Sequence, residues 1–270
     1  MRKIIRKFVK IFYNDVFKKT ALNPVIKPGE EYNAYSSQIN YKLYKKKIKR
    51  IKTKQFIEYN RRTQRINYNL PYVFLPLHAQ PERTTNPIGG IYVDQPLIVD
   101  QLLRCIPDNW YIYVKEHKVQ FDADYTRLLP RKSDFHNRLQ VSERVVLVDI
   151  DTSPFELIDS AKAVATVSGD AGWEAVNRRV PVLLFGAAWY YGCEGVFYAT
   201  DYKNCKNAID KINNGYSVDY NLVKLFAYAL QEVGIKASIH NAFAKAFGIN
   251  DNQTIDEITS ALEKYDMPFK

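Results

Sequence analysis

Four short polar segments in this 270-residue sequence each follow an apolar run and carry side chains suited to chemistry. They are residues 78–83, 115–117, 168–174 and 185–192. Between them they offer a carboxylate, an imidazole, an amine and a glycine-containing turn, the groups used in acid–base chemistry and anion binding. No GxGxxG, GxxxxGK[ST], GxSxG or HExxH motif is present, so the signatures of dinucleotide, P-loop, hydrolase-elbow and zinc-protease sites are missing.

The segment Ser168-Gly-Asp-Ala-Gly-Trp-Glu174 is typical of a phosphate-binding turn. A glycine-containing turn at the start of a helix offers unpaired backbone N–H groups and the positive end of the helix dipole. Ser168 adds a hydroxyl donor, and Glu174 lies where a carboxylate would accept hydrogen bonds from a ribose. Small-residue turns before helices are common, so a turn with no ligand remains the alternative.

Charged side chains follow two of the other apolar runs. Lys115 and His117 together would supply two donors to a phosphate or carboxylate, and the alternative is a structural histidine. Glu82 follows Pro81, which stiffens the loop and aims the carboxylate. The alternative for Glu82 is a salt bridge to Arg83 or Lys115.

Short apolar runs alternate with helical patterns from Pro71 onward, and Ser153 with Pro154 and Glu156 marks one helix start. Buried strands separated by helices predict an α/β fold with a Rossmann-like parallel sheet covered on both faces. Such sheets bind ligands at the carboxyl ends of their strands, where the four polar segments lie. We expect strands at 72–77, 110–114, 144–149, 163–167 and 181–185, and helices at 93–106, 153–161, from about 171, and through most of the chain after Cys205.

The net charge of +10 is concentrated in residues 1–70, which hold 19 Lys and Arg against 4 Asp and Glu. A basic N-terminal arm of this kind suits an anionic membrane surface, with nucleic acid as the less favoured partner. Residues 1–19 have the pattern of an interfacial amphipathic helix. The alternative is that the apolar residues of the arm pack on the body and its lysines form a solvated face. Four aromatic residues interleaved with the basic ones would stack on bases if the partner were nucleic acid: Tyr41, Tyr44, Phe56 and Tyr59.

Cysteine usage and hydropathy indicate a location for the protein. Its three cysteines have no CxxC spacing, which argues against a disulfide framework or a zinc site and favours a reducing compartment. No uncharged apolar run approaches the roughly 20 residues that a membrane-spanning helix needs. We therefore expect a cytoplasmic protein, peripheral at the inner face of the membrane where the basic arm binds lipid.

Taken together, the polar segments resemble the capsule polysaccharide biosynthesis family, whose characterised members include Kdo transferases. The resemblance implies the C-terminal half of a GT-B-like arrangement, in which a Rossmann-like domain binds a nucleotide sugar. On that basis residues 71–270 are the nucleotide-sugar-binding domain with C-terminal helices, and residues 1–70 are a basic, mainly helical arm or a reduced first domain. The segments that carry the resemblance are 76–85, 113–117, 168–175 and 181–186 with Trp189 and Tyr190.

The resemblance also implies a reaction and roles for the candidate residues. Transfer of an acidic, Kdo-like sugar from a CMP-activated donor to a glycan or glycolipid acceptor would need no metal or other cofactor. Glu82 and His117 are then the expected catalytic residues. Two other functions remain open: a different GT-B-shaped nucleotide-sugar enzyme such as an epimerase, and a non-catalytic binding protein whose basic arm docks on membrane or nucleic acid. The expected donor-binding residues are Gln80, Lys115, Ser168, Gly169, Asp170, Gly172 and Glu174.

Two residues depart from the family pattern. Lys118 replaces the proline that usually follows the histidine, and Asp170 stands where a small hydroxyl residue is more usual. A carboxylate at position 170 would repel a donor phosphate unless it caps the helix or turns away.

Overall fold

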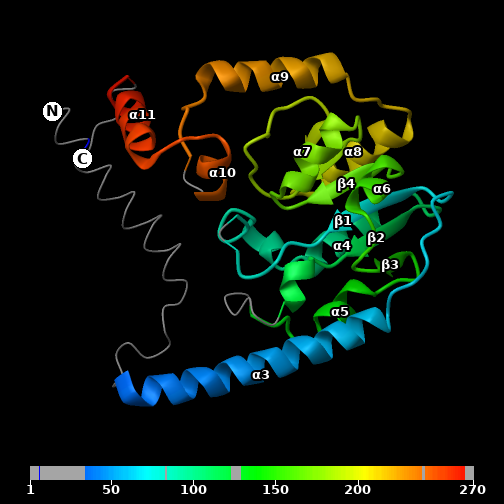
Figure 1. Ribbon diagram of the computed structural model, residues 1–270. Helices are drawn as coiled ribbons and strands as arrows, with labels where there is room; N and C mark the ends of the chain where they lie inside the picture. The colour runs from blue at the N-terminus through cyan, green and yellow to red at the C-terminus, as the bar shows by residue number, and fades with distance from the viewer. Residues whose placement is uncertain (1–5, 7–33, 83, 123–128, 239–240, 265–270) are drawn as a thin grey trace. The chain divides into compact units, whose positions relative to one another are not determined.

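A computed structural model describes residues 6, 34–82, 84–122, 129–238 and 241–264. The chain divides into two compact units, Met1–Ser37 with Tyr228–Lys270, and Gln38–Ala227. The second unit contains the sheet and all the candidate site residues (Figure 1). The interfacial helix expected over residues 1–19 lies outside the described residues, apart from Arg6. No helix among the described residues is long and apolar enough to cross a bilayer.

The core of the second unit is a six-stranded, fully parallel sheet with the order β3-β2-β1-β4-β5-β6. This confirms the predicted α/β, Rossmann-like fold, and five of the strands lie where the apolar runs predict them. The sixth was missed because it is only three residues long and incompletely buried. Chain order reverses at β1, which has β2 on one side and β4 on the other, so the gap between β1 and β4 is the topological switch point. The strands are β1 (Tyr72–Pro76), β2 (Tyr111–Lys115), β3 (Val145–Val148), β4 (Ala163–Thr166), β5 (Val182–Leu184) and β6 (Val196–Tyr198).

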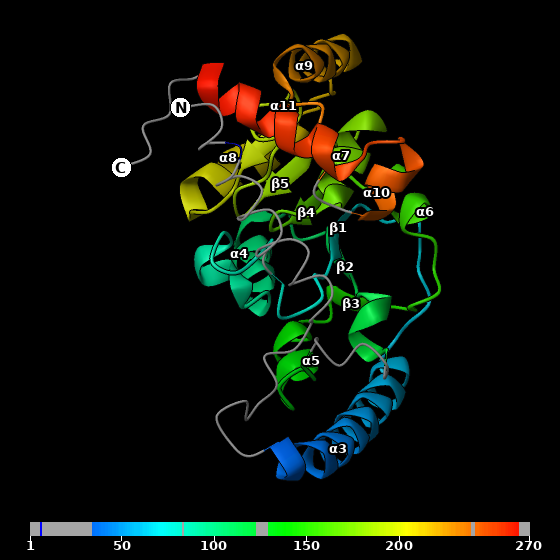
Figure 2. The same ribbon diagram turned by 60° about the vertical axis from the view of Figure 1, so that its left-hand side comes forward.

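Helices cover both faces of the sheet (Figure 2). One face packs on α4 (Pro96–Cys105), α5 (Phe135–Leu139) and α8 (Tyr202–Asn213). The other packs on α6 (Pro154–Asp159), α7 (Asp170–Asn177) and the start of α9 (Tyr220–Val233). Because β1 to β5 are largely buried on both faces of the sheet, their residues are apolar almost without alternation, as the sequence shows. Apart from α3, the remaining described elements are the 3-10 turns η2 (Gly90–Val93) and η3 (Lys118–Phe121) and the helices α10 (Asn241–Ala246) and α11 (Asp251–Lys264).

Two helix starts follow from local sequence. Ser153 caps α6 by accepting a hydrogen bond from the Glu156 N–H, as predicted. The helix expected over 93–106 begins later, at Pro96, because proline has no N–H to pair and its fixed φ suits the first helical position. Residues 90–93 form the separate turn η2 instead.

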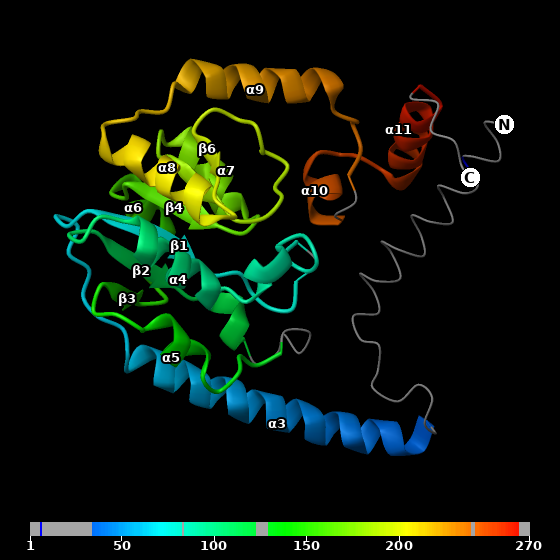
Figure 3. The same cartoon turned by 180° about the vertical axis from the view of Figure 1, so that it is seen from behind.

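Helix α3 (Ala34–Asn60) carries many of the basic residues of the N-terminal 70 residues. Figure 3 shows it running beside α5. Its buried stripe consists of Ile48, Lys52, Gln55 and Tyr59, which recur every three or four residues. The Tyr59 hydroxyl donates to the Val148 carbonyl at 2.6 Å and accepts from the Glu116 N–H at 3.0 Å. From Gln38 onward α3 belongs to the compact unit that contains the sheet.

We expect Tyr59→Phe to lower the free energy of unfolding by about 1–3 kcal/mol, because it leaves two buried backbone groups without a partner. The change removes one oxygen and creates almost no cavity. Urea titration measures it, with Tyr202→Phe as the matched control because Tyr202 is 55% exposed. Equal stabilities of the two variants would show that the Tyr59 hydroxyl does not hold α3 to the sheet.

Candidate functional site

The loops after β1 and β4 meet at the switch point, and His78 joins them. Its Nε2 lies 3.1 Å from Thr166 Oγ1 and 3.5 Å from the Ser168 N–H nitrogen. Gly169 makes this approach feasible, since a Cβ there would lie 2.8 Å from the His78 ring. The Ser168 hydroxyl donates a hydrogen bond to the Thr84 carbonyl. This bond links the loops after β1 and β4, so the hydroxyl hydrogen is not available to a ligand. The parallel topology thus brings two of the predicted polar segments into contact.

Glu82 extends the same cluster. Its Oε2 lies 3.7 Å from His78 Nδ1, and its side chain is 43% exposed. The polar contact with the His78 imidazole lowers the pKa of Glu82, burial opposes this, and the nearby His117 adds to the lowering. Glu82 is therefore a carboxylate at neutral pH, suited to accept a proton or face a developing positive charge.

His117 follows β2 and caps η3. Its Nδ1 accepts a hydrogen bond from the Val119 N–H at 3.2 Å. Desolvation by the neighbouring loops lowers the pKa of His117, while Glu116 and Glu82 oppose that shift. The ring is thus neutral at pH 7 with its proton on Nε2, because Nδ1 is already an acceptor. His78, Glu82, His117 and Ser168 together are called the switch-point cluster below.

Lys115 lies at the flank of this cluster. Desolvation lowers the pKa of Lys115, and the carboxylates of Asp151 and Asp149 oppose the shift. Its neighbour Lys118, the residue that departs from the family pattern, forms a 2.7 Å ion pair with Asp151. Both partners of that pair are more than 70% exposed, so it connects the loops after β2 and β3 at the surface.

Two of the expected donor-binding residues have structural contacts. Gln80 donates from its amide to Thr85 Oγ1 at 2.6 Å and so shapes its own loop. Gly172 is needed for packing, since a Cβ there would lie 2.2 Å from the Tyr190 hydroxyl oxygen. That hydroxyl in turn donates to the Gly169 carbonyl at 2.5 Å. These contacts fix the turn before α7.

Helix α7 carries two acidic residues near its start, Asp170 and Glu174. Asp170 is exposed and occupies the first turn of α7, where a carboxylate is stabilised by the helix dipole. Glu174 lies one turn further along the same helix. Burial and the charge of Asp170 raise the pKa of Glu174, and Arg178 opposes this. Neither residue forms a described hydrogen bond or ion pair with the switch-point cluster.

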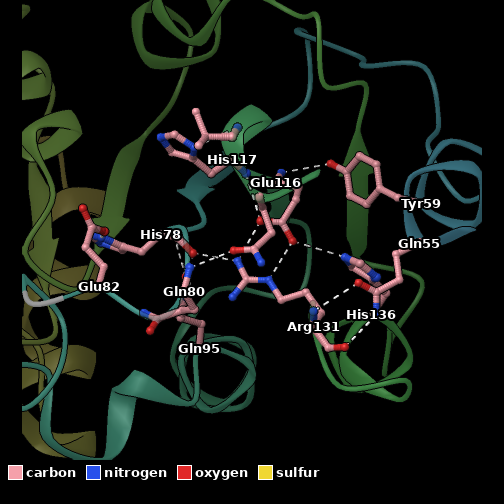
Figure 4. A network of polar contacts seen from close by, with 12 residues as sticks. Gln55, Tyr59, His78, Gln80, Glu82, Gln95, Glu116, His117, Arg131 and His136 are labelled. Atoms are coloured by element: carbon pink, nitrogen blue, oxygen red, sulfur yellow. Dashed lines mark hydrogen bonds and ion pairs between the residues drawn. The ribbon is translucent and has the colours of Figure 1, made fainter. Parts of the chain in front are cut away.

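A buried ionic network beneath the cluster was not predicted from the sequence (Figure 4). Arg131 donates to Glu116 Oε1 at 2.7 Å, to Glu116 Oε2 at 3.0 Å, and to the His78 carbonyl at 2.6 Å. His136 Nε2 lies 3.3 Å from Glu116 Oε2, and the His117 N–H donates to Glu116 Oε1 at 2.9 Å. The network therefore holds the backbone of both His78 and His117.

The charge state of Glu116 follows from its partners. Complete burial would raise the pKa of Glu116, but the charge and hydrogen bonds of Arg131, with those of His136, lower it to about 2. Glu116 is consequently ionised in the folded protein at any pH near neutrality. Its contribution to stability is present above the ordinary pKa of 4.5 and is lost as the pH falls towards 2.

Buried glutamine side chains form hydrogen bonds with the backbone N–H and C=O groups of the loops around this network. Gln95 accepts from the His78 N–H at 2.7 Å and donates to the His78 carbonyl at 3.1 Å. Gln55 of α3 makes the same paired contact with the backbone of Arg131, at 3.1 and 2.6 Å. Gln120 accepts from the Gln80 N–H at 2.7 Å. Buried backbone groups need such partners, so these glutamines fix loops that no strand holds.

The described residues have no grouping of three or more His, Cys, Asp or Glu placed to hold a metal ion. Donors that would face an anion are present instead. They are the Nε2–H of His117, the ammonium group of Lys115 and the first turn of α7.

Comparison with known proteins identifies the family. The profile of the family described as "Capsule polysaccharide biosynthesis protein" matches residues 29–227, which include the whole sheet and α3. The chain belongs to this family. The match begins before α3, in agreement with the helix being part of the sheet unit. A search of curated proteins finds no match to this chain.

Three solved structures give weak matches to the capsule-family chain. One is UDP-GlcNAc 2-epimerase from Methanocaldococcus jannaschii, with 13% identity, a TM-score of 0.40, and coverage of 64% of this chain and 48% of that one. Another is MnaA of S. aureus with UDP, with 14% identity, a TM-score of 0.35, and coverage of 77% and 50%. The third is the beta Kdo 2,4 transferase KpsC of Thermosulfurimonas dismutans, with 13% identity, a TM-score of 0.37, and coverage of 68% and 62%. The chain matches between about half and three fifths of the length of each.

We expect Arg131→Met to destabilise the protein by about 3–5 kcal/mol, since it leaves the Glu116 charge buried without its main partner. The double variant Arg131→Met/Glu116→Gln removes that charge as well and should recover a clear part of the loss. Chemical denaturation of the two variants and the unmodified protein measures this coupling. Additive effects of the two substitutions would contradict an ion pair that positions the loops.

Proposed function

We propose that this protein is a glycosyltransferase of capsule or lipopolysaccharide biosynthesis that uses a CMP-activated, acidic, Kdo-like sugar as donor. The observation that carries the proposal is the convergence of Glu82, His117 and the turn before α7 at the switch point of the sheet. In parallel sheets this is where nucleotides bind, and the chain belongs to a capsule biosynthesis family. The acceptor is a glycan or glycolipid.

The donor phosphate is proposed to lie at the start of α7, facing His117. The positive end of the helix and the Nε2–H of neutral His117 would both stabilise negative charge on the departing nucleotide. Lys115 adds a positive charge at the flank. Glu174, on the same helix, is the proposed contact to the ribose, and the exposed Asp170 points its charge to solvent at the helix start.

In the proposed step an acceptor hydroxyl oxygen forms a bond to the anomeric carbon of the donor sugar. The bond from that carbon to the phosphate oxygen breaks, and its electron pair leaves with CMP. The acceptor proton passes to the Glu82 carboxylate, which the contact with His78 keeps ionised. No metal takes part in this step as proposed.

We expect His117→Ala to weaken CMP binding by roughly 1–3 kcal/mol, the usual cost of losing a charge-assisted hydrogen bond. Its melting temperature without ligand should fall only slightly, since His117 is exposed and the hydrogen bond it loses caps only the four-residue turn η3. Isothermal titration with CMP, UDP and GDP measures the effect. Lys118→Ala is the matched control, because its side chain is engaged by Asp151. A preference for UDP would favour the epimerase alternative, and binding of none of the three would overturn a nucleotide site.

We expect Glu82→Gln to lower the rate of sugar transfer by roughly 10²–10⁴-fold while leaving CMP affinity within about twofold, because it removes the proton acceptor and keeps the side-chain shape. CMP release from CMP-Kdo in the presence of glycolipid acceptor is the measurement. Glu143→Gln is the control, since Glu143 is an exposed carboxylate before the amino end of β3, whereas Glu82 follows the carboxyl end of β1. Equal rates for the two variants would exclude Glu82 as the base.

A further inference from the structure

The exposed face of α3 is strongly basic. Residues 43–65 contain ten Lys and Arg and a single carboxylate, Glu58. Of these cations only Lys52 is buried, where its Nζ donates to the Asp122 carbonyl at 2.8 Å. The other nine are exposed along α3 and the turn that follows it: Lys45, Lys46, Lys47, Lys49, Arg50, Lys54, Arg61, Arg62 and Arg65.

Apolar side chains lie among the cations on this outward face. Leu43 is 61% exposed and Ile57 is 45% exposed. At 100° per residue both lie opposite the buried stripe that contains Ile48 and Tyr59. Fourteen residues separate them, a distance of about 21 Å along the helix. A basic face with exposed aliphatic residues is typical of a helix that lies in a bilayer interface.

Two of the described aromatic residues of α3 that would stack on nucleic-acid bases, Phe56 and Tyr59, pack against the protein, and the side chain of Tyr41 lies outside the described residues. Tyr59 is fully buried, and Phe56 packs edge-on against Phe121 with ring centroids 5.6 Å apart. Tyr44 is half-buried. The stacking expected from the sequence is therefore wrong for Tyr59 and disfavoured for Phe56. Over residues 43–60, where the structure describes the side chains of α3, the exposed large apolar residues are the aliphatic Leu43 and Ile57.

We propose that the outward face of α3 docks the protein on an anionic lipid bilayer. The cations attract the lipid headgroups, and Leu43 and Ile57 enter the interface between them. This contact goes beyond the proposed transferase activity and does not depend on the donor. A protein held in this way would meet acceptors carried on lipid at the membrane surface.

Co-sedimentation of the full chain with vesicles tests the proposal. Vesicles of phosphatidylcholine with about one third phosphatidylglycerol should bind the protein at low salt, and pure phosphatidylcholine vesicles should not. Raising the ionic strength to 1 M should release it. The variant Lys46→Gln/Lys47→Gln/Lys49→Gln/Arg50→Gln should bind the anionic vesicles at least about tenfold more weakly. Its melting temperature and its CMP affinity should be unchanged, because all four side chains are exposed.

A matched control separates α3 from net charge. The variant Lys162→Gln/Lys203→Gln/Lys211→Gln/Lys224→Gln removes the same charge from exposed lysines of the sheet unit outside α3 and should bind as the unmodified protein does. An equal loss in both variants would overturn the proposal, as would equal binding to neutral and anionic vesicles. Binding to single-stranded RNA without binding to anionic vesicles would overturn it in favour of a nucleic-acid contact.

Discussion

A buried ion pair between Glu116 and Arg131 fixes the loops that carry the candidate site. One guanidinium group binds the Glu116 carboxylate and the His78 carbonyl, so the ends of β2 and β1 are joined through a single side chain. Desolvating two charges is costly, and the contact is favourable only because hydrogen bonds satisfy both groups. His136 and the His117 N–H complete that set. The arrangement is better explained by the positioning of loops than by stability alone.

Other contacts of the site add to the positioning that this ion pair provides. Gly169 allows His78 to approach the turn before α7, and Gly172 allows Tyr190 to hold the same turn from its other side. Glu82 is thereby presented as a carboxylate and His117 as a neutral donor, close to the start of a helix. The site therefore combines the carboxylate of Glu82 with hydrogen-bond donors from His117 and the start of α7, an arrangement suited to the sugar transfer proposed above.

The sequence predicts the sheet well because its signal is local. Residues 72–77 are apolar throughout and residues 163–167 are apolar apart from Thr166, as strands buried on both faces require. The parallel topology places the loops at the carboxyl ends of neighbouring strands together, so the meeting of the loop after β1 with the Ser168 turn could be predicted from the sequence. The ionic network was not, because Arg131 and His136 lie 15 and 20 residues from Glu116 in irregular sequence with no spacing motif. Likewise, only tertiary packing shows that α3 belongs to the sheet unit and that the Ser168 hydroxyl donates a hydrogen bond to the Thr84 carbonyl.

Hydrogen exchange measured with and without CMP tests the central claim, that the switch-point cluster is a nucleotide site. Amides slow when a ligand covers them or rigidifies their loop, and the readout requires no knowledge of the acceptor. If the cluster binds a nucleotide, exchange will slow in peptides covering residues 78–86, 115–120 and 167–172, with no change at the amino ends of the strands. Unchanged exchange in all three loops at saturating CMP, or slowing confined to other parts of the chain, would contradict it.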